Sequence, residues 1–194
     1  MRKSKTPLAY PGKIVDNDSV IKNVSNKKVV IPMDIIVSED VEAGFLQDIG
    51  YILADSDFRK LSRYVHHKNT TRLMHSINVA YISWKLAKKM GCDARTAARI
   101  GMLHDFCLYD FRERANGSQV FRHPKVAAEK SEERFEISDK EKKAILSHMF
   151  PLGPLPTSKE AWIISFADKM CAVTERFSID IALSRKNRIQ VNAA

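Results

Sequence analysis

The sequence has little cysteine and no long apolar run. Its three cysteines, at positions 92, 107 and 171 of 194 residues, are odd in number and form no C-x-x-C unit. This argues against a disulfide framework and a thiolate zinc knuckle, so we expect small, reduced core residues. No apolar run approaches the roughly 18 residues of a membrane span, and the basic N-terminus lacks the apolar segment of a secretory signal. We therefore expect a cytoplasmic protein.

Acidic residues are the minority among the charges. The chain has 23 Asp and Glu against 32 Lys and Arg, a net charge of +9. This balance favours an anionic partner, for which phosphate-bearing small molecules, nucleic acid and a membrane surface all qualify. A basic surface that merely maintains solubility explains the charge equally well. Nucleic acid is the weakest candidate, because Lys and Arg are spread along the chain and no aromatic-basic RNA motif occurs.

Strand signals are confined to the N-terminal fifth of the chain. Residues 1–37 contain β-branched runs without helical periodicity, which predicts an extended N-terminal arm with room for one short strand. From Ser38 onward helical periodicity dominates and no βαβ alternation appears. We therefore predict an all-α domain of about six helices over residues 38–194.

Caps and breakers predict the ends of the first three helices. Ser38, followed by two acidic residues, predicts the start of the first helix, and the "DSD" at 55–57 predicts a break or kink. The second helix is predicted over residues 71–90 and ends at Gly91, as helices often end at a glycine. Asp93 is the predicted N-cap of the third helix.

Similar signals mark the second half of the chain. His123 and Pro124 predict a helix start with proline at its first position. Ser138 and Glu141 form a capping-box pattern at the start of the next helix. "PLGPLPTS" is the strongest breaker in the chain, and a last long helix is predicted to begin near Ser158.

Three predicted helices each place a metal-capable side chain on an apolar face. His75 follows the i, i+4, i+7, i+11 spacing of the apolar residues in its helix. His104 shares an apolar face of the next helix, and Asp105 follows about 100° further round. Asp168 continues the apolar row of the last helix. All four side chains are therefore expected to point into the interior.

A bound cation explains these inward polar residues better than ordinary packing does. A buried ionised carboxylate is costly unless it is paired or bound to a cation, and no Lys or Arg lies on the same apolar faces. Lys169 is expected to point about 100° away from Asp168. A single inward histidine is more often a hydrogen-bonded core residue. A divalent metal, however, satisfies the imidazole and carboxylate groups together.

These residues resemble the motifs of the HD-domain metal-dependent phosphohydrolases, which carry H, then HD, then D on successive helices. "RLMHSINVA", "GMLHDF" and "SFADKMCAV" are similar to the three motifs in order and surroundings, and the resemblance covers about residues 45–180. It implies an HD-domain helical bundle. It also implies a first metal held by His75, His104 and Asp168, with Asp105 completing that site or bridging to a second ion.

Two further histidines resemble the extra ligands of binuclear family members. His123 in "FRHPKVAAE" and His148 in "ILSHMFPL" lie between the HD pair and the last aspartate. This placement of the two histidines implies a second metal. With it, the sequence resembles the HDIG branch, which includes the bacterial hydrolases that split diadenosine tetraphosphate symmetrically. The alternatives are a helix N-cap for His123 and a favourable contact with the helix dipole for His148. His66 and His67 match no motif and are expected on the surface.

The sequence departs from the family pattern directly after the HD pair. "FCLYDF" stands where many relatives have a glycine and a lysine, so a phosphate contact has to come from elsewhere. No GYP sequence accompanies the motif, which argues against a cyclic dinucleotide phosphodiesterase. Arg72, Lys169 and Arg122 are candidates for binding the substrate phosphate, with Arg72 favoured. Each is also explained as an ordinary solvated charge.

The resemblance implies a metal-dependent phosphohydrolase acting on a nucleotide or another small phosphate ester or anhydride. A bound divalent metal lowers the pKa of its water from ~15.7 toward ~7, so hydroxide forms near neutral pH. His104 and Asp105 are the expected catalytic residues. The mixed nitrogen and oxygen ligands favour one or two ions of iron, manganese, cobalt or nickel. The alternative is a non-catalytic HD-domain sensor or docking module that binds metal and nucleotide. No membrane or nucleic-acid partner is expected, and a homodimer is left open.

Overall fold

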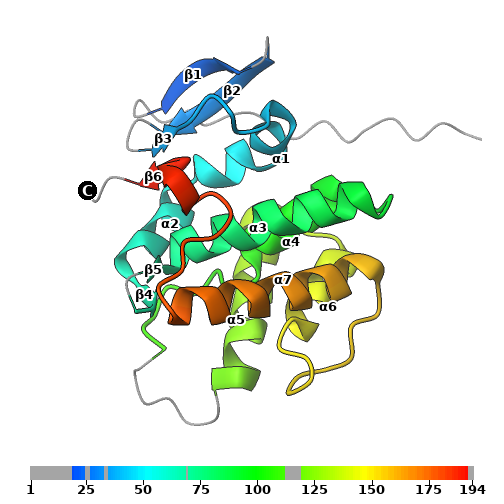
Figure 1. The fold of residues 1–194 in the computed structure, drawn as a ribbon. Helices are drawn as coiled ribbons and strands as arrows, with labels where there is room; N and C mark the ends of the chain where they lie inside the picture. Colours follow the sequence, from blue (N-terminus) through cyan, green and yellow to red (C-terminus); the bar gives the residue numbers. More distant parts are fainter. Residues whose placement is uncertain (1–18, 25–26, 33–34, 69, 112–118, 192–194) are drawn as a thin grey trace, which may run out of the picture.

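Helices build most of the molecule in the computed structural model, which describes residues 19–24, 27–32, 35–68, 70–111 and 119–191 (Figure 1). The described α-helices are α1 Ala43–Leu53, α2 Ser56–Arg59, α3 Arg72–Lys89, α4 Ala94–Leu103, α5 Gln119–Phe135, α6 Asp139–Ser147 and α7 Lys159–Arg176. Two 3-10 helices, η1 Lys60–Arg63 and η2 Arg185–Asn187, accompany them. The prediction of an all-α bundle is confirmed, with seven α-helices in the described part instead of about six.

Three short antiparallel ladders border the bundle. The strands are β1 Ser19–Val24 paired with β2 Lys27–Pro32, β3 Ile35–Val37 paired with β6 Ile189–Val191, and β4 Val65–His67 paired with β5 Thr70–Thr71. The described part of the predicted arm therefore contains three strands, where the sequence predicts room for one. Residues 1–18 of the arm lie outside the described residues. The boundary at residue 37 stays a prediction.

Helix α3 lies at the centre of the bundle and packs against α4 and α7. Gly101 permits the close approach of α4, since a Cβ atom there would lie 2.5 Å from the Cα atom of Ala80 in α3. Any larger residue would push the two helices apart. This contact matters for the site, because His75 lies in α3 and His104 is the C-cap of α4.

Most of the predicted helix ends are confirmed. The Thr71 and Asp93 side chains accept hydrogen bonds from the N–H groups of Met74 and Thr96, and so cap α3 and α4. Gly91 follows the C-cap of α3 with a φ of +63°. The predicted capping box opens α6, and Ser158 caps α7.

Two predicted helix starts are wrong. The N-cap of α1 is Glu42, while Ser38 continues the β3 pairing and donates its N–H to the Arg188 carbonyl at 2.8 Å. Pairing with a distant part of the chain thus overrides the local capping signal. Helix α5 already includes Gln119, so Pro124 lies inside the helix and His123 is no N-cap.

The cysteines and the helix lengths agree with the sequence predictions. Cys107 and Cys171 are buried free thiols, and Cys92 is a half-buried free thiol. Among the described residues, none of the helices combines the length and apolar composition that a bilayer crossing demands.

Candidate metal centre

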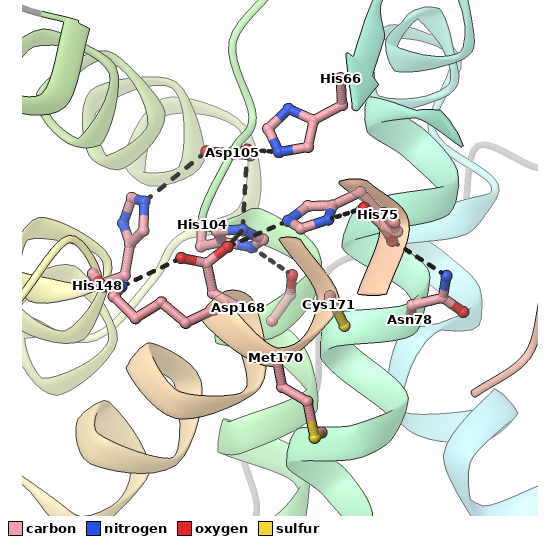
Figure 2. Close-up of polar contacts among 12 residues, drawn as sticks. His66, His75, Asn78, His104, Asp105, His148, Asp168, Met170 and Cys171 are labelled. Carbon is pink, nitrogen blue, oxygen red and sulfur yellow. Dashed lines mark hydrogen bonds and ion pairs between the residues drawn. The ribbon is translucent and has the colours of Figure 1, made fainter. Parts of the chain in front are cut away.

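The six predicted metal ligands lie together in the interior of the bundle. Each is less than a tenth exposed. They are His75, His104, Asp105, His123, His148 and Asp168. Figure 2 labels His75, His104, Asp105, His148 and Asp168. Five helices contribute to this cluster, so residues separated by up to 93 positions meet in one place.

Two of the histidines occupy the ends of helices. His104 is the C-cap of α4 and His148 is the C-cap of α6. Asp105 therefore lies just beyond α4, so the prediction that it lies about 100° further round the same helix is wrong, although its side chain is buried as expected. The chain turns at this point, and the Cys107 N–H donates to the Asp105 backbone carbonyl at 2.6 Å.

Backbone carbonyls determine which nitrogen of three histidines is free to bind a metal. The Nδ1 atoms of His104, His123 and His148 lie 2.8, 2.6 and 2.7 Å from carbonyl oxygens of their own helices. A neutral imidazole that donates from Nδ1 has its lone pair on Nε2. Each of the three therefore presents Nε2 as a metal ligand, in the orientation that outer hydrogen-bond partners give to metal-binding histidines. For His148 the predicted helix-end contact coexists with this free nitrogen.

His75 receives its orientation from a carboxylate that the sequence analysis does not identify. Its Nδ1 lies 2.7 Å from Oε2 of Glu175, and its Nε2 lies 3.2 Å from Oδ1 of Asp168. Burial alone would lower the pKa of His75, but these two carboxylates outweigh it and raise the pKa to about 10. Glu175 follows Asp168 by seven residues on the same face of α7, and this spacing is a signal that could have identified it.

Asp105 lies between two groups of histidines. Its Oδ1 atom is 3.5 Å from Nε2 of His123 and 3.8 Å from Nε2 of His148. Its Oδ2 atom is 3.8 Å from Nε2 of His104. These separations are too long for hydrogen bonds. They suit two donors that share one ion, each at roughly 2.0–2.2 Å from it.

Several polar atoms of the cluster lack a protein partner. Nε2 of His104 and Oδ1 of Asp105 are buried without a hydrogen bond to any described group. Nε2 of His123 and Nε2 of His148 lie 2.9 Å apart, and both lone pairs face each other when Nδ1 holds the proton. A cation between these atoms would remove the repulsion. The residues present therefore fit a divalent metal.

The ionisation states of several ligands suit metal binding, whereas His75, with its raised pKa, has to release a proton when a metal binds. Burial lowers the pKa of His148 to about 3, so its imidazole is neutral near pH 7. Burial alone would raise the pKa of Asp105 and of Asp168, but the surrounding histidines outweigh it and hold both pKa values below their ordinary range. Neutral imidazoles and ionised carboxylates are the forms that bind divalent ions.

His66 belongs to the cluster, so the prediction that it is a surface residue is wrong. Its Nε2 lies 3.6 Å from Oδ2 of Asp105, and its ring centroid is 4.2 Å from that of His75 (Figure 2). It comes from the three-residue strand β4, which is too short to show a regular alternation of apolar and polar residues in the sequence. His67 is half-buried, and its ring centroid lies 5.8 Å from that of His75.

The three predicted phosphate-binding residues occupy different places. Arg72 is fully buried, and its guanidinium donates to the Cys107 and Tyr109 carbonyls just after the HD pair. Arg122 is exposed on α5, above the Tyr109 ring. The Lys169 ammonium donates to the His148 carbonyl at 2.6 Å and lies 3.4 Å from Oδ2 of Asp168. The prediction that Lys169 points away from Asp168 is therefore wrong, because its long flexible stem folds back along the helix.

Comparison with known proteins agrees with the geometry. A family model described as "HD domain" matches residues 72–173, which is more than half of the chain. The match begins at α3 and contains all six predicted ligands, but not His66 or Glu175. No curated protein and no solved structure matches the chain.

Proposed function

The chain belongs to the HD-domain family, and we propose that it is a phosphohydrolase acting on a nucleotide or another small phosphate ester or anhydride. The family is one of metal-dependent phosphohydrolases, and the buried His/Asp cluster fits a metal site. One observation carries the proposal. Four helical histidines direct Nε2 atoms toward two buried carboxylates, and this donor set suits a hydrolytic metal better than a structural one.

The six predicted ligands fall into two groups, and His66 forms a third metal-capable group with His75 and Asp105. His75, His104 and Asp168 would hold one ion, while His123 and His148 would hold a second together with Asp105. Such ions polarise a phosphoryl oxygen and lower the pKa of a bound water. Because no thiolate is among the donors, we propose iron, manganese, cobalt or nickel.

Residues of the chain itself provide orientation and charge. Glu175 sets the rotation of the His75 ring, and Asp105 links the two groups of ligands. The Lys169 side chain is about two-fifths exposed, and its ammonium lies beside Asp168. It is therefore the basic group best placed to bind a substrate phosphate in the absence of a lysine after the HD pair. The net charge of +9 favours the approach of an anionic substrate.

Turnover of a substrate panel tests the proposal. We expect phosphate or nucleoside release from one or more nucleotides, with diadenosine tetraphosphate in the panel, when Mn²⁺ or Fe²⁺ is present. The double variant His104→Ala/Asp105→Ala should release nothing, while Glu132→Ala, which removes an exposed carboxylate on α5, should match the wild type. Metal-loaded wild-type protein that turns over no member of the panel would favour the non-catalytic sensor instead.

A further inference from the structure

Helix α7 is apolar on two opposite faces. Its inward face carries Ala161, Ile164 and Asp168 into the bundle. A helix with one face in water normally places polar side chains on that face. The outward face of α7 instead carries four exposed apolar residues, namely Trp162 (47% exposed), Phe166 (60%), Val173 (58%) and Phe177 (69%). We call these four residues the α7 stripe.

Further exposed apolar side chains lie shortly before and after α7 in the sequence. Eleven large apolar residues are exposed in the described part of the chain, and seven of them lie between positions 152 and 179. The three besides the stripe are Leu152, Leu155 and Ile179. Figure 1 shows α7 along one side of the bundle, with no other element drawn in front of it. Large contiguous apolar patches are rare on monomers and mark interaction sites.

The spacing of the α7 stripe is the same in both directions along the helix. Successive members are separated by four, seven and four residues. In an antiparallel pair of α7 helices, a two-fold axis between positions 169 and 170 would place Trp162 opposite Phe177 of the second copy. The same axis would place Phe166 opposite Val173. Such self-complementarity is the requirement of a symmetric dimer interface.

We propose that the α7 stripe is the interface of a symmetric homodimer. A standard interface buries about 800 Å² per partner. Three aromatic residues of roughly 150–250 Å² each, about half to two-thirds exposed, provide about 260–440 Å² of this area. The exposed aliphatic side chains before, within and after α7 add to it. A membrane surface would not require the symmetric spacing, so a second copy is the occupant that the sequence of α7 favours. Lys169 lies on the same face of α7, between Phe166 and Val173, so its stem would contact the second copy while its ammonium stays directed at Asp168. The test of the dimer does not depend on turnover.

Sedimentation velocity of the full chain tests the dimer. At micromolar concentration, the molecular mass of the wild-type protein should be twice the 22.1 kDa of a single chain. Phe166→Glu should raise the dimer dissociation constant at least about 100-fold, because the symmetry introduces the buried charge twice. The matched control is Phe121→Glu on α5, whose phenylalanine is 57% exposed outside the patch, and it should remain dimeric. Thermal unfolding by circular dichroism shows whether both variants fold.

Disulfide cross-linking tests the position of the proposed two-fold axis. Met170→Cys lies beside the axis, so oxidation should link two chains in this variant and not in wild-type protein. Three outcomes would overturn the proposal: monomeric wild type, a folded Phe166→Glu variant that stays dimeric, or equal dissociation by Phe121→Glu. Monomeric wild type that co-sediments with phosphatidylserine vesicles would assign the patch to an anionic membrane instead.

Discussion

A histidine binds a metal through a nitrogen that carries no proton, and its hydrogen-bond partner determines which nitrogen that is. Backbone carbonyls of the same helix serve His104, His123 and His148. His75 depends on the Glu175 side chain, which comes from another helix. A charged acceptor holds the imidazole more strongly than a carbonyl does and makes it a better ligand. Glu175 is therefore the outer residue with the most influence on the first metal.

Glu175→Gln is expected to weaken metal binding by about 10-fold to 100-fold. Glutamine keeps the shape of the side chain but removes the negative charge that holds the His75 ring. Calorimetric titration of metal-free protein with Mn²⁺ measures the effect. Glu133→Gln, at an exposed position of α5, should bind like the wild type. Unchanged affinity in Glu175→Gln would show that the carboxylate does not support the ligand.

Arg72→Met is expected to destabilise the protein by about 2–3 kcal/mol. The guanidinium donates to two backbone carbonyls in the segment after the HD pair, and a buried carbonyl without a donor is costly. Urea unfolding of the metal-free protein measures this loss. A phosphate-binding role would instead raise KM and leave the free energy of unfolding unchanged. Arg122→Met, at an exposed position, should have no effect on unfolding.

Helical periodicity predicted the buried residues within helices, and the HD-type motif order predicted Asp105, whereas His66 was missed. His75 and Asp168 follow a helical period, so their burial is predictable from the positions of apolar neighbours. Asp105 follows the end of α4, and His66 lies in a three-residue strand, where no period applies. Lys169 was misplaced because the periodicity of a helix gives the direction of Cβ and not that of a long flexible stem.

At the scale of the elements, Glu160 joins three helices. It lies in the first turn of α7, accepts the Asp93 N–H at the start of α4 at 3.2 Å, and pairs with Lys140 of α6 at 2.8 Å. Burial alone would raise the pKa of Glu160, but these hydrogen bonds outweigh it and hold the pKa below its ordinary 4.5. The ionised carboxylate is thus the form that stabilises the packing.

Glu160→Gln is expected to lower the free energy of unfolding by about 1–2 kcal/mol at pH 7. A depressed folded-state pKa contributes stability above the unfolded pKa, and this contribution disappears as the pH falls below 4.5. The difference between wild type and variant should therefore shrink between pH 5 and pH 3. Urea unfolding of metal-free protein at several pH values measures it. Glu132→Gln, which removes an exposed ion pair with Lys142, should change stability by less than about 0.5 kcal/mol.

Local capping signals predicted the helix ends that depend on neighbouring residues. Thr71, Asp93 and Ser158 each bind an N–H three residues ahead, and such contacts are encoded in a few adjacent positions. The start at Ser38 failed because its N–H pairs with the carbonyl of Arg188, 150 residues away in the chain. Strand pairings between distant segments leave no comparable local pattern.

At the scale of the whole molecule, the metal centre connects parts of the chain that are far apart. Its ligands come from α3, the ends of α4 and α6, the second turn of α5 and the middle of α7. The HD-type motif order made this convergence predictable before any contact was known. The β3–β6 ladder, which joins the N-terminal arm to the C-terminal end, was not predictable, because each strand has only three residues.

A cation bound by five helices should stabilise the fold as a whole. Binding to the folded state alone adds about 2.7 kcal/mol when the free ion is at 100 times its Kd, which corresponds to a rise in Tm of roughly 5–10 °C for a chain of this size. Removal of metal by chelation should lower Tm by this amount, and Mn²⁺ should restore it. The His104→Ala/Asp105→Ala variant should show no response to Mn²⁺, since it lacks a ligand from each metal group. A wild-type Tm that is unchanged by chelation and by Mn²⁺ would mean that the cluster is a hydrogen-bonded core and not a metal centre.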